Sequence, residues 1–107
     1  MAQIEEINKD SFSKVLESKI PVLVDFYAQW CGPSRKLTPV LEQIQGEYQE
    51  GVKIYKINSD DNVDILKEYG VMGLPTLILF KDGEAKEVMT GMMPKSAIVS
   101  NIKKLTT

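Results

Sequence analysis

The chain has 107 residues, of which 43% are hydrophobic and 26% charged, as is typical of one soluble globular domain spanning residues 1–107. Thirteen basic and fifteen acidic side chains give a formal net charge of −2, which excludes the strongly basic surface of a nucleic-acid-binding domain. No apolar run approaches the ~20 residues needed to cross a bilayer, and residues 1–6 lack the apolar core of a signal peptide. We therefore expect a cytoplasmic protein that binds neither nucleic acid nor membrane.

The numbers of cysteines and histidines limit the chemistry that this chain can perform. A single cysteine, Cys31, excludes an internal disulfide and the cysteine-rich zinc sites. The absence of histidine excludes Ser-His-Asp and Cys-His catalysis and removes the commonest metal ligand. We expect no metal and no cofactor, so any chemistry must use Cys31, carboxylates, lysines or backbone groups.

Hydrophobic periodicity predicts the elements in chain order. Apolar residues recur at helical spacing after the cap candidates Asn8 and Asp10, which predicts a helix near residues 9–18. The run at 22–27, VLVDFY, is apolar on both faces and is typical of a central strand that is covered on both sides.

A second helical stripe runs from residue 37 to about 46. Pro39 lies inside this stripe and should kink the helix, because proline lacks the N–H that the turn requires. Residues 52–58 are rich in β-branched and aromatic side chains and predict another strand. A third helix over 63–69 stops at Gly70, which suits a left-handed cap.

The C-terminal part of the chain predicts a hairpin followed by a helix. Residues 76–80 form a strand, and Asp82-Gly83 is a strong two-residue turn signal leading into a strand near 85–90. Pro94 suits the first position of a last helix, whose apolar face lies over 98–105.

The predicted order of elements is β-α-β-α-β-α-β-β-α. Crossover helices require parallel strands early in the chain, and the hairpin requires an antiparallel pair late in it. We therefore predict the α/β class, with a mixed central β-sheet and helices on both faces.

Cys31 falls just after the central strand, at the start of the second helix. The free N–H groups and the dipole of a helix N-terminus stabilise an anion, so this position favours the thiolate, which is the nucleophilic form of cysteine. Arg35 and Lys36 add positive charge in the same turn. These residues make Cys31 a candidate nucleophile.

The motif Trp30-Cys31-Gly32-Pro33 after an apolar strand resembles the active site of the thioredoxins, in particular those of bacterial type. The segment 71–76 (VMGLPT), the turn 80–83 (FKDG) and Gly91 occur in matching order, so the resemblance covers essentially the whole chain. It implies a thioredoxin fold and thiol–disulfide oxidoreductase activity. The implied partners are disulfide-containing proteins and a thioredoxin reductase.

The same resemblance assigns roles around the motif. Cys31 corresponds to the nucleophile, while Gly32 and Pro33 shape the turn. Pro75 resembles the family's cis-proline, and Leu74 would offer its backbone to an extended substrate by strand-like pairing. The remaining substrate-binding candidates are the apolar rim and two loop glycines: Trp30, Met72, Gly73, Gly91, Met92 and Met93.

Two charged residues at core positions also match residues of the family. Asp25 lies inside the apolar run, where an unpaired carboxylate is costly and tends to protonate. Lys56 shares a strand face with core positions. Together they resemble the buried aspartate of thioredoxins and its lysine partner. In that family the carboxylate is assigned to proton transfer at the resolving cysteine.

Ser34 departs from the family pattern, because it stands where the resolving cysteine belongs. Thiol–disulfide exchange passes through a mixed disulfide, which the second thiol must attack to release the product. A serine hydroxyl cannot perform this step, so we expect stable adducts on Cys31 and almost no turnover. We interpret Ser34 as a deliberate substitution of cysteine. We expect a monomer that Cys31 can link into a dimer when oxidised.

Three alternatives remain open from the sequence. A natural monothiol oxidoreductase would use an external thiol such as glutathione, as glutaredoxins with a Cys-Gly-Phe-Ser motif do. A redox-independent binding module would use the surface between Trp30 and Met93. Two Cys31 thiolates from two chains could instead hold an iron–sulfur cluster.

Overall fold

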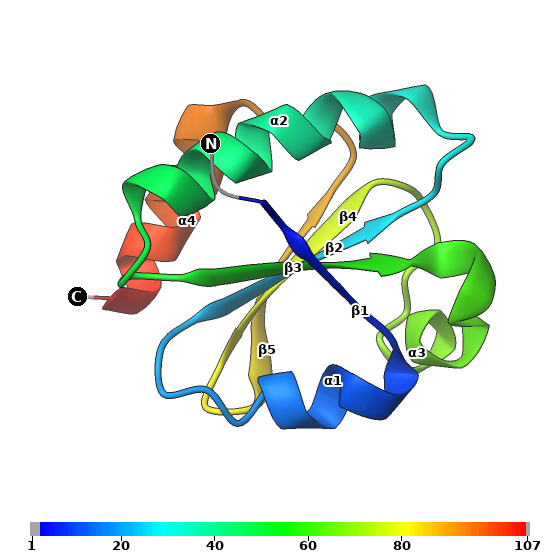
Figure 1. Cartoon of the computed structure of the whole chain (residues 1–107), viewed down its shortest axis with the longest axis horizontal. Coiled ribbons are helices and arrows are strands. Elements are labelled where there is room, and N and C mark those ends of the chain that lie inside the picture. The colour runs from blue at the N-terminus through cyan, green and yellow to red at the C-terminus, as the bar shows by residue number, and fades with distance from the viewer. Residues whose placement is uncertain (1–2, 107) are drawn as a thin grey trace.

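Five strands form one mixed sheet with helices on both faces (Figure 1), in a computed structural model that describes residues 3–106. The elements in chain order are β1 (Glu5–Ile7), α1 (Lys9–Val15), β2 (Val22–Tyr27), α2 (Gly32–Glu47), β3 (Lys53–Asn58), the 3-10 turn η1 (Ser59–Asp61), α3 (Val63–Glu68), β4 (Thr76–Lys81), β5 (Glu84–Thr90) and α4 (Lys95–Thr106). The predicted order of elements and the mixed central sheet are therefore confirmed. Within residues 3–106, every helix is too short or too polar to span a bilayer.

The strands lie side by side in the order β1-β3-β2-β4-β5. β3 pairs in parallel with both β1 and β2, whereas β4 runs antiparallel to β2 and β5. Parallel pairing early in the chain and antiparallel pairing late in it agree with the prediction. β2 is the central strand and all six of its residues are buried, as its apolar run indicated.

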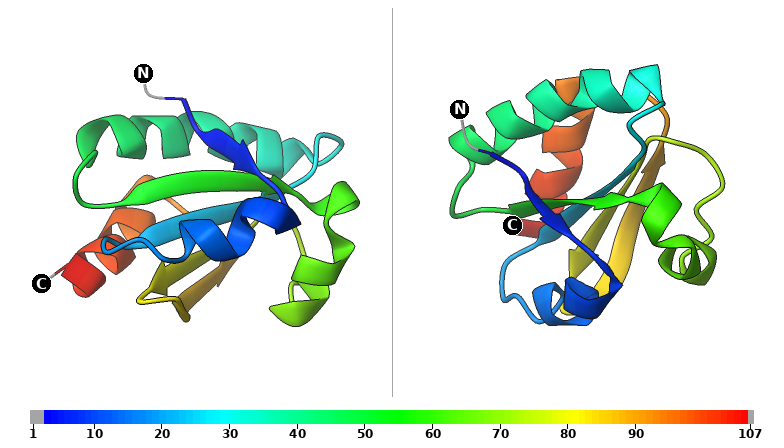
Figure 2. Two further views of the ribbon diagram at one scale, coloured as in Figure 1. Left: turned by 60° about the horizontal axis from the view of Figure 1, so that its bottom comes forward. Right: turned by 45° about the vertical axis from the view of Figure 1, so that its right-hand side comes forward.

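Helices cover both faces of the sheet (Figure 2), and a hydrophobic layer lies beneath them on each face. α2 and α4 pack on the face that carries Leu23, and α1 and α3 pack on the face that carries Phe26. Because side chains alternate along a strand, Asp25 points to the same face as Leu23, beneath α2 and α4. The second layer holds three aromatic rings whose centroids lie within 5.7 Å of one another: Phe12, Tyr69 and Phe80.

Two helix boundaries differ from the predicted ones. α1 begins at Lys9 after the cap Asn8, whose side chain accepts from the Asp10 and Ser11 N–H groups, but it ends at Val15 rather than at residue 18. The Glu17 and Ser18 N–H groups then bond to carbonyls three residues back, which tightens the chain into a turn. α4 begins at Lys95, one residue after Pro94, whose carbonyl accepts from the first turn.

The predicted chain reversals are present. Gly70 follows α3 with φ +66, and the Val71 N–H donates to the Leu66 carbonyl at 2.8 Å, the pattern of a Schellman cap. Asp82 and Gly83 both have positive φ, as a type I′ hairpin turn requires. Pro39 lies inside α2 as predicted.

Candidate active site

Cys31 sits where the loop after β2 enters α2. It is the N-cap residue of the helix, and its side chain makes no capping hydrogen bond, so the sulfur is not engaged by the first turn. Its N–H donates to the Ala28 carbonyl at 3.1 Å, and Arg35 Nη1 donates to the Gln29 carbonyl at 2.7 Å, which ties the loop to the helix. The half-buried thiol thus lies at the positive end of a 16-residue helix.

A second loop, between α3 and β4, also meets the sulfur. The Leu74–Pro75 peptide bond is cis, as predicted. Cys31 Sγ donates to the Leu74 carbonyl oxygen at 3.8 Å, so this loop lies directly beside the thiol. The loop is anchored at both ends, because Thr76 Oγ1 donates to the Gly73 carbonyl at 2.6 Å and the Gly91 N–H donates to the Pro75 carbonyl at 2.8 Å.

Gly32 and Pro33 open α2 directly after the nucleophile. Gly32 is the first residue of the helix, and a Cβ built there would meet no atom within 4 Å. Neither backbone conformation nor space therefore requires glycine at this position. Pro33 is exposed in the first turn, where its missing N–H leaves no helical bond unmade.

A mainly apolar cavity of about 470 Å³ opens beside the thiol. Its lining residues come from four segments of the chain: Trp30, Cys31, Ser59, Asp60, Leu66, Val71, Met72, Gly73 and Leu74. The Trp30 indole Nε1 donates to Asp60 Oδ2 at 3.0 Å, which holds the ring over the cavity mouth. Met72 is 99% exposed, so it offers its whole side chain to a partner.

The two methionines after Gly91 have different positions. Met92 is exposed, but it does not line the cavity beside Cys31. Met93 packs against the core of the α2 and α4 layer. Met93 remains half-buried, it does not line this cavity either, and Pro94 separates it from the start of α4.

Ser34 is buried on the inner face of α2, with 1% of its surface exposed. Its Oγ has no hydrogen-bond partner. The other buried residues of the helix, among them Leu37 and Leu41, belong to the core cluster of Leu23. The side chain at position 34 therefore faces the same layer as Asp25.

Asp25 is 1% exposed, and its Oδ1 has no hydrogen-bond partner. Burial raises the pKa of its carboxyl from an ordinary 3.8 to about 7, and the nearby Lys56 charge opposes this only in part. Desolvation is the larger effect because burial removes the water that would stabilise the carboxylate. Asp25 is thus a group whose protonation changes near neutral pH.

Lys56 lies opposite Asp25 in the pairing of β2 with β3, as the sequence predicted for partners. Its Nζ lies 5.5 Å from the centroid of the Tyr27 ring. The ion pairs within 4.0 Å among residues 3–106 are Lys86 with Glu84 and Lys95 with Glu47, so Lys56 and Asp25 do not form one. The lysine therefore acts on the carboxyl through the field of its charge.

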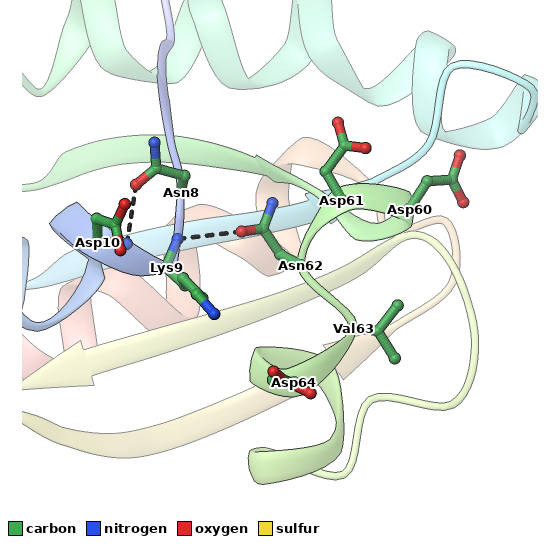
Figure 3. Close-up of a pocket in the computed structure, with 8 residues that line it drawn as sticks. All are labelled: Asn8, Lys9, Asp10, Asp60, Asp61, Asn62, Val63 and Asp64. Atoms are coloured by element: carbon green, nitrogen blue, oxygen red, sulfur yellow. Dashed lines mark hydrogen bonds between the residues drawn. The ribbon is translucent and has the colours of Figure 1, made fainter.

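A second cavity, of about 420 Å³, shares Asp60 with the first. Figure 3 shows the residues that line it. Its walls carry Asp10, Asp61 and Asp64, with Lys9 between them. Asn62 connects the two segments that line the cavity, since its Oδ1 accepts from the Lys9 N–H at 3.0 Å. In the described part of the chain, no group of three or more His, Cys, Asp or Glu side chains could hold a metal ion.

Several residues of the site were not identified from the sequence. Asp60, Leu66 and Val71 contribute to the cavity beside Cys31, and Tyr27 contributes to the surroundings of Lys56. Asp60 is thirty positions from Trp30 in the sequence, so no local sequence pattern predicts their contact. An aspartate after a strand end was the one available signal, and it also fits an ordinary turn.

Comparisons with known proteins agree with this geometry. The thioredoxin family model matches residues 3–104. The chain is 46% identical over 99 residues to thioredoxin from Rickettsia felis, covering 92% of this chain and 94% of that protein. It is 43% identical over 104 residues to the chloroplastic M-type thioredoxin of Chlamydomonas reinhardtii, covering 96% and 74% of the two chains.

Among solved structures, a single-site mutant of thioredoxin from Halobacterium salinarum NRC-1 superposes with a TM-score of 0.90 at 35% identity. The match covers 98% of this chain and 92% of that one. The five-stranded mixed sheet with its flanking helices is therefore the thioredoxin fold. Together, the family model, the relatives and the fold establish that this chain belongs to the thioredoxin family.

Proposed function

We propose that this chain captures protein disulfides through Cys31 and that Ser34 prevents their release. The observation that carries the proposal is the position of Cys31, a half-buried thiol at the N-cap of α2 beside an apolar cavity. A nucleophilic sulfur in such a place can meet an incoming disulfide, and the cavity can hold the side chains next to it.

The capture step is a thiol–disulfide exchange. The Cys31 thiolate attacks one sulfur of the substrate, a new bond forms between Cys31 Sγ and that sulfur, and the substrate S–S bond breaks. The second substrate sulfur leaves with the electron pair and takes a proton from water. One disulfide has replaced another, so no external oxidant or reductant is consumed.

The substrate would dock along the loop before β4. The Leu74 carbonyl lies beside Cys31 Sγ and can accept from the backbone of an extended segment, as an added strand would pair. Trp30 and Met72 supply exposed apolar surface for varied partners. Gly73 and Gly91 flank the cis-proline loop, and Met92 extends the apolar surface further along the chain.

Release of the product requires a second thiol at position 34. A hydroxyl is not ionised near neutral pH, and an S–O bond would not replace the disulfide. Ser34 Oγ is buried without a partner in the layer that also holds the buried carboxyl of Asp25. A carboxyl suited to proton transfer at a resolving thiol is thus retained, which supports the proposal that serine replaces a resolving cysteine. We further propose that the parent form is a cytoplasmic monomer served by a thioredoxin reductase.

The first test is the mass of the intact chain after mixing with insulin or another disulfide substrate. We expect an adduct of one substrate half per chain, stable until dithiothreitol is added. Cys31→Ser should form no adduct. An unmodified chain under these conditions would refute capture by Cys31.

The second test is turnover. Ser34→Cys should raise the rate of insulin reduction at least about a hundredfold, since nucleophile and resolving group act as a unit. Equal rates for the two forms would contradict the role of position 34. Adding glutathione to the Ser34 chain checks the monothiol alternative, which the single cysteine favours, because only an externally resolved enzyme would then turn over.

A further inference from the structure

Three ionisable side chains occupy one row across the sheet. Glu6 of β1 is the register partner of Lys56 in β3, which is in turn the partner of Asp25 in β2. Ile7 packs in the α1 and α3 layer and Ile4 in the opposite one, so alternation points Glu6 to the same face as Asp25. Lys56 thus stands between two carboxyl groups.

Tyr27 fixes the outer end of this row. Its hydroxyl donates to Glu6 Oε1 at 2.7 Å, and its ring lies 5.5 Å from Lys56 Nζ. The hydrogen bond holds the Glu6 carboxylate at the hydroxyl end of the ring, and Glu6 belongs to β1, which lies on the other side of β3 from Asp25. Among residues 3–106 Lys56 forms an ion pair within 4.0 Å with neither acid, so both carboxylates act on the cation over the Tyr27 ring through their charge, and Asp25 Oδ1 keeps no partner.

We infer that Glu6 is a positioning residue that competes with Asp25 for the Lys56 ammonium and thereby sets how readily the buried carboxyl releases its proton. The Glu6 charge acts in two ways. It draws the cation outward, and it adds a negative potential about two strand spacings (~10 Å) from Asp25. Both effects favour the protonated form of Asp25. The functional meaning rests on the proposed role of Asp25 at a resolving thiol.

The other neighbours of Asp25 leave Glu6 as the distinguishing charge. β4 places Leu77 opposite Asp25, and α2 contributes the uncharged Ser34 to this layer. The core residues of α4 in this layer are Ile98 and Ile102. Asp61 of η1 also acts on Tyr27 through its charge.

The test is a titration of Asp25 by NMR, in chains carrying ¹³C-labelled aspartate, with Asp25→Asn used for assignment. Glu6→Gln keeps the acceptor for Tyr27 and removes the charge. We expect it to lower the titration midpoint of Asp25 by about half a pH unit, a fraction of the effect of one charge at this distance near the protein surface. Glu6→Asp, which restores the charge, should bring the midpoint back toward the parent value.

Glu5→Gln is the matched control. It makes the same change in net charge on the neighbouring residue of β1, which points to the opposite face, so the midpoint should stay in place. A shift of equal size in both variants, or no shift in Glu6→Gln, would overturn the inference.

A second readout separates this inference from the proposed function. In the Ser34→Cys background, the pH profile of disulfide reduction should move to lower pH with Glu6→Gln and remain unchanged with Glu5→Gln. The NMR titration does not depend on thiol chemistry. Failure of Cys31 to capture disulfides would therefore refute the proposed function alone, whereas capture with identical titrations in Glu6→Gln and Glu5→Gln refutes the competition for Lys56 alone.

Discussion

Asp25 shows how one buried group can oppose stability while remaining available for chemistry. Its carboxyl is almost completely removed from water, and its Oδ1 receives no hydrogen bond. Lys56 lies on the adjacent strand, but its ammonium is placed over the Tyr27 ring. Desolvation therefore outweighs the attraction of the lysine and raises the pKa of Asp25 to about 7.

Asp25→Asn should stabilise the protein at alkaline pH. Because the folded-state pKa lies above the unfolded value, the stability contributed by the neutral carboxyl is fully present below about pH 4 and is lost as the pH rises through about 7. The asparagine amide has no such proton to lose, so the gain at pH 8 should reach up to about 4 kcal/mol, at 1.36 kcal/mol per pH unit. Urea unfolding at pH 4 and pH 8 measures it.

Asp82→Asn serves as the control for this pH dependence, since Asp82 is exposed in the hairpin turn and asparagine also tolerates a positive φ. Its unfolding free energy, relative to the parent chain, should not change across the same pH range. An Asp25→Asn variant that is equally stable relative to the parent at both pH values would contradict the burial argument.

At the scale of elements, the end of α3 determines where the cis-proline loop lies. The left-handed Gly70 turns the chain, and the hydrogen bond from the Val71 N–H to the Leu66 carbonyl closes the cap. Both Leu66 and Val71 then line the cavity beside Cys31. The left-handed conformation of Gly70 therefore helps to position two residues that line the cavity.

Gly70→Ala should destabilise the protein by about 1 kcal/mol, because an L-residue with φ +66 is strained even where its Cβ meets no other atom. Gly51→Ala is the comparison. Gly51 has no left-handed φ, and the nearest atom to its Cβ would be 3.8 Å away, so this variant should be neutral or slightly stabilised. Urea unfolding compares the stabilities of the two variants. Equal losses of unfolding free energy would argue against a special requirement for glycine at the cap.

At the scale of the whole molecule, the sheet separates two hydrophobic layers that share no core residue. The layer under α2 and α4 contains the polar site residues Asp25 and Ser34, whereas the layer under α1 and α3 contains the packed aromatic rings. The site therefore draws on both layers, because Leu66, Val71 and Leu74, which line the cavity beside Cys31, pack against the second one.

Ile44→Val and Ile78→Val, one in each layer, should each lower the free energy of unfolding by about 1 kcal/mol through loss of one methylene group. Since the two positions lie on opposite faces of the sheet, the double variant should equal the sum within about 0.5 kcal/mol and unfold in one transition. A larger discrepancy in chemical denaturation would show that the layers are coupled across the sheet.

Local patterns in the sequence determined the type and order of the elements. Three features could be predicted without a structure, because each depends on side chains close together in the chain: the apolar run at 22–27, the Asn8 cap and the Asp82-Gly83 turn. Family resemblance added the cis bond before Pro75. The early end of α1 was missed because the change to a tighter turn leaves no clear mark in the hydrophobic pattern.

Only the tertiary structure decided which distant side chains share a space. The contact of Trp30 with Asp60, the packing of the half-buried Met93 against the core and the hydrogen bond from Tyr27 to Glu6 depend on strand neighbours and helix docking. Short-range periodicity specifies the face on which a side chain lies but not what it meets there. That partner is chosen when segments far apart in the chain are packed together.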